Sequence, residues 1–178
     1  MGRLVTMHTQ STMTALPMSS AQARPFPMGG IRRILLATDL SPASEGAAIQ
    51  ALDLAHDLGA DLLIVSVIDP RSLRLPGGRF GVRVDQVRTG REAAAQELVS
   101  RGRAAGVRVN FLIWDGDPGE SIVDAARSEQ VDLIVVGSHG RGQVGRFLIG
   151  SVSDHVVRHA HCPVLVVRAQ PATEPALS

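Results

Sequence analysis

The chain has 178 residues, 44% hydrophobic and 20% charged, which is a composition typical of a single globular domain. A formal net charge of +1 and an aromatic content of 3% argue against a nucleic-acid-binding surface, and no apolar run reaches the roughly 20 residues of a membrane span. All 18 basic residues are arginine and Cys162 is the only cysteine, which excludes a lysine-dependent phosphate loop, a Schiff-base lysine and an internal disulfide.

The first 30 residues differ in composition from the rest of the chain. Residues 1–30 are rich in Met, Ser, Thr and Pro and contain no continuous apolar segment, so they predict a disordered N-terminal extension rather than a signal peptide. We expect one domain over residues 31–168 and a frayed tail over residues 169–178. With no recognisable leader and one cysteine, the chain is expected in the cytoplasm.

Short apolar runs rich in β-branched residues predict five strands. Their expected ranges are Ile34–Thr38, Leu62–Ile68, Val107–Trp114, Val131–Gly137 and Val164–Val167. Capping residues and helical periodicity predict four helices between them. The first helix is capped by Ser41, has Pro42 in its first turn and ends near Leu58, before Gly59. The second covers Asp85–Ala105, and the third is capped by Asp117 and runs to about Glu129. The fourth covers Ser151–Ala160. Two prolines and three glycines between Asp69 and Val84 predict a mobile loop.

Strands and helices alternate along the chain, which indicates an α/β fold with one open parallel sheet and helices on both faces. Ligands of such sheets bind at the carboxyl ends of the strands, where the winding direction reverses. Asp39 follows the first strand, and Gly137 ends the fourth. If these two strands are neighbours, a ligand site is expected between them.

The glycine-rich segment from Gly137 to Ser153 has the features of a phosphate site. Its glycines allow backbone N–H groups to approach an anion closely, and a helix that begins near Ser151 would direct its positive end there. The pattern Gly140-x-Gly-x-x-Gly145 does not fit a dinucleotide fingerprint, because it follows the fourth strand and no acidic residue ends the next strand. A lysine-dependent phosphate loop is excluded because Gly150-Ser151 stands where glycine and lysine are required.

The segment does match a longer pattern, Gly137-x2-Gly140-x9-Gly150-Ser151. Other motifs accompany it in order: Ile34-Leu-Leu-Ala-Thr-Asp-Leu-Ser41, Ser66-Val-Ile-Asp69, Val135-Val-Gly-Ser-His-Gly140 and Cys162-Pro-Val-Leu-Val-Val167. Together they cover nearly everything from residue 31 to 168. In these motifs the chain resembles the ATP-binding branch of the universal stress protein family.

The resemblance implies an adenine nucleotide alpha hydrolase-like sheet with strand order 3-2-1-4-5, a stress-response role, and ATP as ligand with Mg²⁺ or Mn²⁺ on its phosphates. Ala37, Asp39 and Val67 would surround the adenosine. The residues expected at the nucleotide are Ala37, Thr38, Asp39, Val67, Val136, Gly137, Gly140, Arg141, Gly150, Ser151, Val152 and Ser153. The family often has proline at the position of Ala37 and threonine at that of Ser153.

Several alternatives remain open from the residues alone. Asp39 could be a turn residue only, and Ser151 or Ser153 could be a helix N-cap. His155 and His159 are spaced for a shared metal but also fit a solvated helix face. A slow ATPase or a phosphoryl or nucleotidyl transferase is the rival function, although no acidic residue lies between positions 137 and 153.

The last predicted strand, Val164–Val167, is apolar and is expected at an edge of the sheet. An exposed apolar edge favours pairing with another chain, so a homodimer in which two such strands meet antiparallel is predicted. In the alternative arrangement, the C-terminal tail covers the edge and the protein is a monomer.

Overall fold

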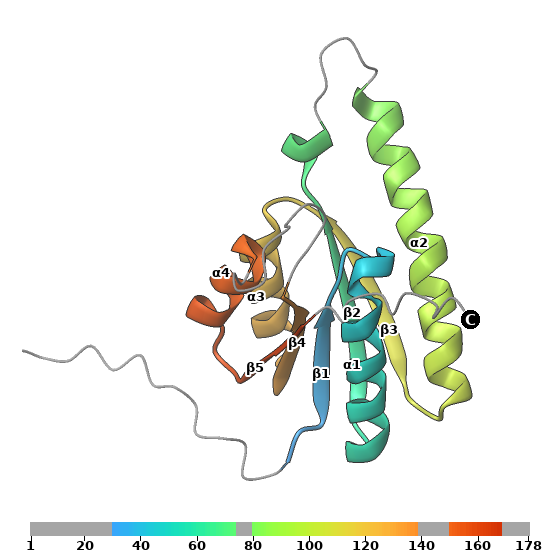
Figure 1. Ribbon diagram of the computed structural model, residues 1–178, viewed down its shortest axis with the longest axis vertical. Coiled ribbons are helices and arrows are strands. Elements are labelled where there is room, and N and C mark those ends of the chain that lie inside the picture. The colour runs from blue at the N-terminus through green and yellow to red at the C-terminus, as the bar shows by residue number, and fades with distance from the viewer. Residues whose placement is uncertain (1–29, 74–79, 139–149, 169–178) are drawn as a thin grey trace, which may run out of the picture.

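In a computed structural model, residues 30–73, 80–138 and 150–168 are described, and within them five strands form one parallel sheet (Figure 1). The strand order is β3-β2-β1-β4-β5, which confirms the predicted α/β fold and its topology. The strands are β1 (Arg33–Ala37), β2 (Asp61–Ile68), β3 (Val109–Asp115), β4 (Leu133–Gly137) and β5 (Val164–Val167). The helices are α1 (Glu45–Leu58), α2 (Phe80–Ala104), α3 (Pro118–Ser128) and α4 (Ser151–His159), with short 3-10 turns η1 (Pro42–Ser44) and η2 (Pro70–Leu73).

The sheet is buried on both faces. Alternate residues of β1 belong to different cores, since Ile34 and Leu36 pack with α1 and α2, whereas Leu35 packs with α3. Figure 1 shows α3 and α4 together on one side of the sheet. Burial on both faces explains why the central strands read as continuous Val, Ile and Leu runs without alternation. None of the helices in the described ranges is long and apolar enough to span a membrane.

Two of the predicted helix ends are confirmed by their cap geometry. Gly59 adopts the left-handed conformation at φ 62°, and its N–H donates to the carbonyls of Ala55 and His56 at the end of α1. The Asp117 carboxylate accepts hydrogen bonds from the N–H groups of Gly119 and Glu120 at the start of α3. Both caps act within one helical turn, so local sequence suffices to predict them.

Other boundaries differ from the sequence-based expectation. The loop predicted over 69–84 is wrong at both ends, because Pro70–Leu73 forms a 3-10 turn and α2 begins at Phe80 rather than at Asp85. Asp69 supports the turn by accepting from the N–H of Arg71 at 2.9 Å. Residues 80–84 contain no proline to break a helix, and Gly81 disfavours helix by only about 1 kcal/mol. The third strand begins at Val109 rather than at Val107, whose N–H instead donates to the Gly102 carbonyl in the turn after α2.

Candidate functional site

The carboxyl ends of β1 and β4 lie side by side, where the sequence predicted a ligand site. Ala37 at the end of β1 is paired in register with Val136 of β4, and both residues are buried. The chain leaves β1 through Thr38 and Asp39 towards α1, and it leaves β4 through Gly137 towards α4. These two departures, to helices on opposite faces of the sheet, make this the switch point of the fold.

The turn after β1 is held by its own side chains. The Thr38 hydroxyl accepts from the N–H of Leu40 at 2.9 Å and shares a hydrogen bond of 2.8 Å with the Ser44 hydroxyl. Leu40 adopts a positive φ of 58°, which is uncommon for a residue other than glycine. Asp39 Oδ1 accepts from both the N–H and the hydroxyl of Ser41, at 3.0 and 2.7 Å.

Asp39 is therefore a turn residue, which is one of the two roles that the sequence predicted for it. Ser41 occupies the predicted N-cap position ahead of Pro42, but its hydroxyl reaches back to Asp39 and makes no side-chain cap hydrogen bond. The turn nevertheless keeps the Asp39 carboxylate next to the carboxyl end of β1, partly exposed. Contact between Asp39 and a ligand stays a prediction.

The start of α4 is tied to the ends of β4 and β5. The N–H of Ser138 donates to the Val167 carbonyl at 2.7 Å, and the N–H of Gly150 donates to the Ser138 carbonyl at 2.8 Å. The Ser153 hydroxyl donates to the Gly137 carbonyl at 2.6 Å. These bonds place the N-terminus of α4 at the switch point.

The serines of α4 have different roles from the predicted cap. Gly150 occupies the N-cap position and no side chain caps the helix, so the N-cap interpretation of Ser151 and Ser153 is wrong. Ser151 is the first helical residue and is exposed. Ser153 is 3% exposed and its hydroxyl is directed at the Gly137 carbonyl, so contact with a phosphate would require that bond to break. Val152 is partly buried against the core under α3, and Gly140 and Arg141 lie outside the described residues.

An arginine that the sequence reading did not single out lies at the end of β2. Arg91 of α2 donates from Nη1 to the Val67 carbonyl at 2.5 Å and to the Ser66 hydroxyl at 3.0 Å. Val67 is one of the predicted adenosine neighbours, and its side chain is buried. No local pattern connects Arg91 to β2, because they are 24 residues apart and meet only through the packing of α2 on the sheet.

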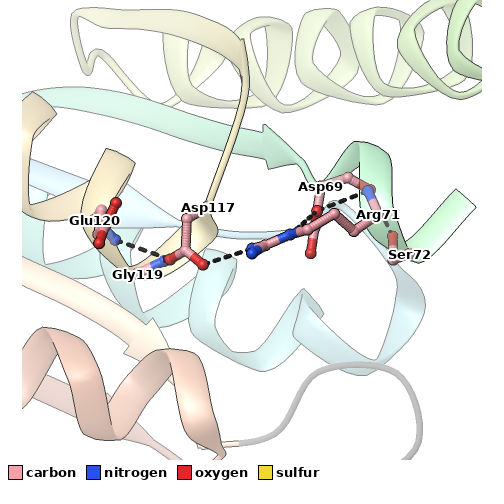
Figure 2. Close-up of polar contacts among 6 residues, drawn as sticks. All are labelled: Asp69, Arg71, Ser72, Asp117, Gly119 and Glu120. Atoms are coloured by element: carbon pink, nitrogen blue, oxygen red, sulfur yellow. Dashed lines mark hydrogen bonds and ion pairs between the residues drawn. The ribbon is translucent and has the colours of Figure 1, made fainter.

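A second arginine bridges two carboxylates at the same edge of the sheet. Figure 2 shows Arg71, in the turn after β2, reaching across to Asp117 at the start of α3. Its guanidinium lies 3.1 Å from Asp69 Oδ1 and 2.7 Å from Asp117 Oδ2. These hydrogen bonds to Arg71 hold the pKa of both carboxyl groups below the ordinary value. Both acids follow strand ends in the sequence, a signal that could have placed them at this edge.

Helices α3 and α4 touch closely beside this edge. A Cβ atom added at Gly119 would lie 2.8 Å from Cγ of His155, so only glycine fits there without a shift. The rings of His155 and His159 stack at 4.2 Å, and His159 Nδ1 lies 2.8 Å from the His155 carbonyl oxygen. Across the described ranges, no group of three or more His, Cys, Asp or Glu side chains is placed to hold a metal ion.

Comparison with known proteins agrees with this geometry. The sequence model of the universal stress protein family matches residues 30–168. A universal stress protein of Methanocaldococcus jannaschii is 31% identical over 139 residues, which are 77% of this chain and 82% of that protein. The solved universal stress protein UspA from Lactobacillus plantarum has a TM-score of 0.66 at 27% identity, covering 78% of this chain and 99% of that one.

A further solved relative bears on the ligand. It is a universal stress protein in complex with cAMP, with a TM-score of 0.60 at 25% identity, covering 79% of this chain and 99% of that one. The family match spans all five strands and all four helices described above. The chain therefore belongs to the universal stress protein family.

Proposed function

We propose that this chain binds an adenine nucleotide, with ATP as the principal ligand, between the carboxyl ends of β1 and β4. The observation that carries the proposal is the anchoring of the α4 N-terminus at this switch point by the Ser138, Gly150 and Ser153 hydrogen bonds. A helix start provides unpaired N–H groups and a positive dipole end for a phosphate. A solved relative with the same fold, a universal stress protein in complex with cAMP, supports an adenine nucleotide as the ligand.

The residues at the edge divide into two groups. On the phosphate side, Gly150 has no Cβ and Ser151 is exposed, so both leave room for an anion at the start of α4. On the nucleoside side, Asp39 presents a carboxylate, which is an acceptor suited to ribose hydroxyls. Mg²⁺ or Mn²⁺ would bind through the phosphates, since hard divalent cations prefer oxygen ligands and commonly use substrate phosphates.

We further propose that the bound nucleotide acts as a signal rather than as a substrate. Phosphoryl transfer needs a positioned base and carboxylates for the metal, and no acidic residue lies between Gly137 and Ser153. Partners in the cytoplasm would then read the nucleotide-bound state during stress. A slow ATPase is the alternative, and we expect turnover with ATP and Mg²⁺ to fall far below the enzyme median of about 10 per second.

Assembly is part of the same proposal. Within the part of the chain that the structure describes, β5 pairs only with β4, so its other side is an edge there, and Leu165 in this strand is 37% exposed. Two copies could cover this edge by pairing their β5 strands antiparallel. Leu165→Glu should then convert a dimer into a monomer of 18.8 kDa in light scattering. A wild-type mass already near 18.8 kDa would rule the dimer out.

The direct test of the site is calorimetric titration with ATP, ADP, AMP and cAMP. Gly150→Val should abolish binding, because Gly150 has an ordinary negative φ of −61° that valine tolerates while the added side chain occupies the anion's space. Gly90→Val is the matched control, since a Cβ at that exposed helical position meets nothing within 4 Å. Wild-type affinity in Gly150→Val would refute the assignment.

A further inference from the structure

The end of β2 extends beyond the end of its neighbour β1. The register between β1 and β2 ends at the pair Ala37 and Val65, after which the N–H of Thr38 donates to the Val65 carbonyl at 3.1 Å. On the other side, the pairing of β2 with β3 continues to Ile68 and Asp115. Among the described residues, the last residues of β2 therefore have a strand neighbour on one side only.

Hydrogen bonds along β2 show which residues face the missing neighbour. Asp61 and Val65 bond to the β1 side, at Arg32 and Thr38, whereas Leu62 and Ile68 bond to the β3 side. Backbone polar groups of a strand point alternately to its two sides, so odd-numbered residues of β2 face β1. The carbonyl of Val67 therefore points to the β1 side, beyond the last residue pair of the β1–β2 register.

The guanidinium of Arg91 donates a hydrogen bond to this carbonyl. Its Nη1 lies 2.5 Å from the Val67 carbonyl oxygen and 3.0 Å from the hydroxyl of Ser66, which is 1% exposed. A guanidinium is charged at every accessible pH and carries five N–H donors but no acceptor. A carbonyl oxygen has two lone pairs, and Arg91 takes one of them with a charged donor, so a second N–H donor at the Val67 oxygen also meets the positive charge of the guanidinium.

This arrangement has a consequence for a purine at the nucleoside end of the proposed site. A 6-amino purine brings an N–H donor to the strand edge and needs an acceptor such as the Val67 carbonyl. A 6-oxo purine brings an acceptor, which a guanidinium N–H can satisfy. Strong discrimination between close analogues arises when one of them leaves a polar group of the site unpaired, so an edge that holds both an acceptor and a donor discriminates only weakly.

We propose that Arg91 is a specificity-determining residue that sets the preference of the site between 6-amino and 6-oxo purine nucleotides, an inference that rests on the proposed nucleotide binding. With Arg91 present, the site accepts a 6-oxo purine nearly as well as adenine. Without Arg91, the edge keeps the Val67 acceptor and loses the charged donor, and the site selects adenine.

The experiment compares the dissociation constants of ATP and inosine triphosphate for the full chain by calorimetry. The dissociation constant of inosine triphosphate divided by that of ATP should rise about tenfold in Arg91→Met, as expected for one charge-assisted hydrogen bond. Arg91→Lys retains a cation and a donor and should keep the wild-type ratio. Ser66→Ala is the matched control, because it removes another hydrogen-bond partner of Arg91 and leaves the Val67 carbonyl in place.

Thermal unfolding of each variant separates loss of fold from loss of selectivity, and Arg91→Gln replaces Arg91→Met if the latter does not fold. If Arg91→Met, or Arg91→Gln in its place, folds and its ratio of dissociation constants stays within twofold of the wild-type ratio, the inference is overturned. An equal loss of affinity for both triphosphates would also overturn it. Wild-type protein that binds neither triphosphate would overturn the proposed function, and the inference with it. Nucleotide binding with an unchanged ratio would overturn the inference alone.

Discussion

The tight contact between α3 and α4 can be tested with Gly119→Ala. An alanine Cβ at this position would lie 2.8, 2.9 and 3.0 Å from Cγ, Cδ2 and Cβ of His155. These atoms are at the base of the imidazole ring rather than at a flexible end, so the ring must rotate or the two helices must separate. Since α4 begins at Ser151, a separation would also move the helix start proposed to hold phosphate.

The size of the effect follows from two opposing contributions. Overpacking a tight contact costs about 1–3 kcal/mol, while replacing glycine by alanine in a helix contributes up to about 1 kcal/mol in the opposite direction. Gly90→Ala is the matched control, because Gly90 is exposed in α2 and an added Cβ meets nothing within 4 Å. Gly119 is the second residue of α3 and Gly90 lies inside α2, so the helix contribution differs between the variants by at most about 1 kcal/mol, and the rest of their difference is the overpacking cost.

Thermal unfolding measures this difference. For a chain of this length, 1 kcal/mol shifts Tm by about 2–4 °C, so Gly119→Ala should unfold roughly 2–12 °C below Gly90→Ala. The single tryptophan, Trp114, is half-buried on β3 and provides a fluorescence signal. Nucleotide affinity should fall in Gly119→Ala only. Equal Tm values for the two variants would show that the α3–α4 contact accommodates a methyl group without strain and would refute the reasoning.

Three further outcomes are expected. In urea unfolding, Asp117→Ala should lose about 1 kcal/mol and Asp117→Asn less, because asparagine keeps the cap acceptor; equal losses would contradict the cap. Arg71 depresses the pKa of Asp69 and Asp117, so the stability that it adds is present above their ordinary value of 3.8 and is lost as the pH falls through their lower folded values. The Tm difference between wild type and Arg71→Gln should therefore shrink below about pH 4, and a difference that grows on acidification would contradict this. Burial raises the pKa of the Cys162 thiol to about 11, so alkylation at pH 8 should be slow in the native state and faster in urea; similar rates would contradict the burial.

The sequence by itself determined the fold class and the order of the elements. Five apolar runs alternating with capped helices allow few arrangements other than a parallel sheet, and right-handed crossovers restrict the topology further. The ends marked by Gly59 and Asp117 were also readable, because a C-cap glycine and an N-cap carboxylate act on backbone groups within one turn. The switch point followed from the strand order that the family resemblance implied.

Only the tertiary structure decided how the site's polar groups are paired. Ser153 is paired with Gly137, 16 residues away, rather than with its own helix start, and Arg91 is paired with Val67, 24 residues away. The Arg71 bridge to Asp117 spans 46 residues. Each of these bonds forms because packing helices on a parallel sheet brings strand ends and helix starts to one edge. Backbone propensity and periodicity act over a few residues and carry no information about which distant groups will meet there.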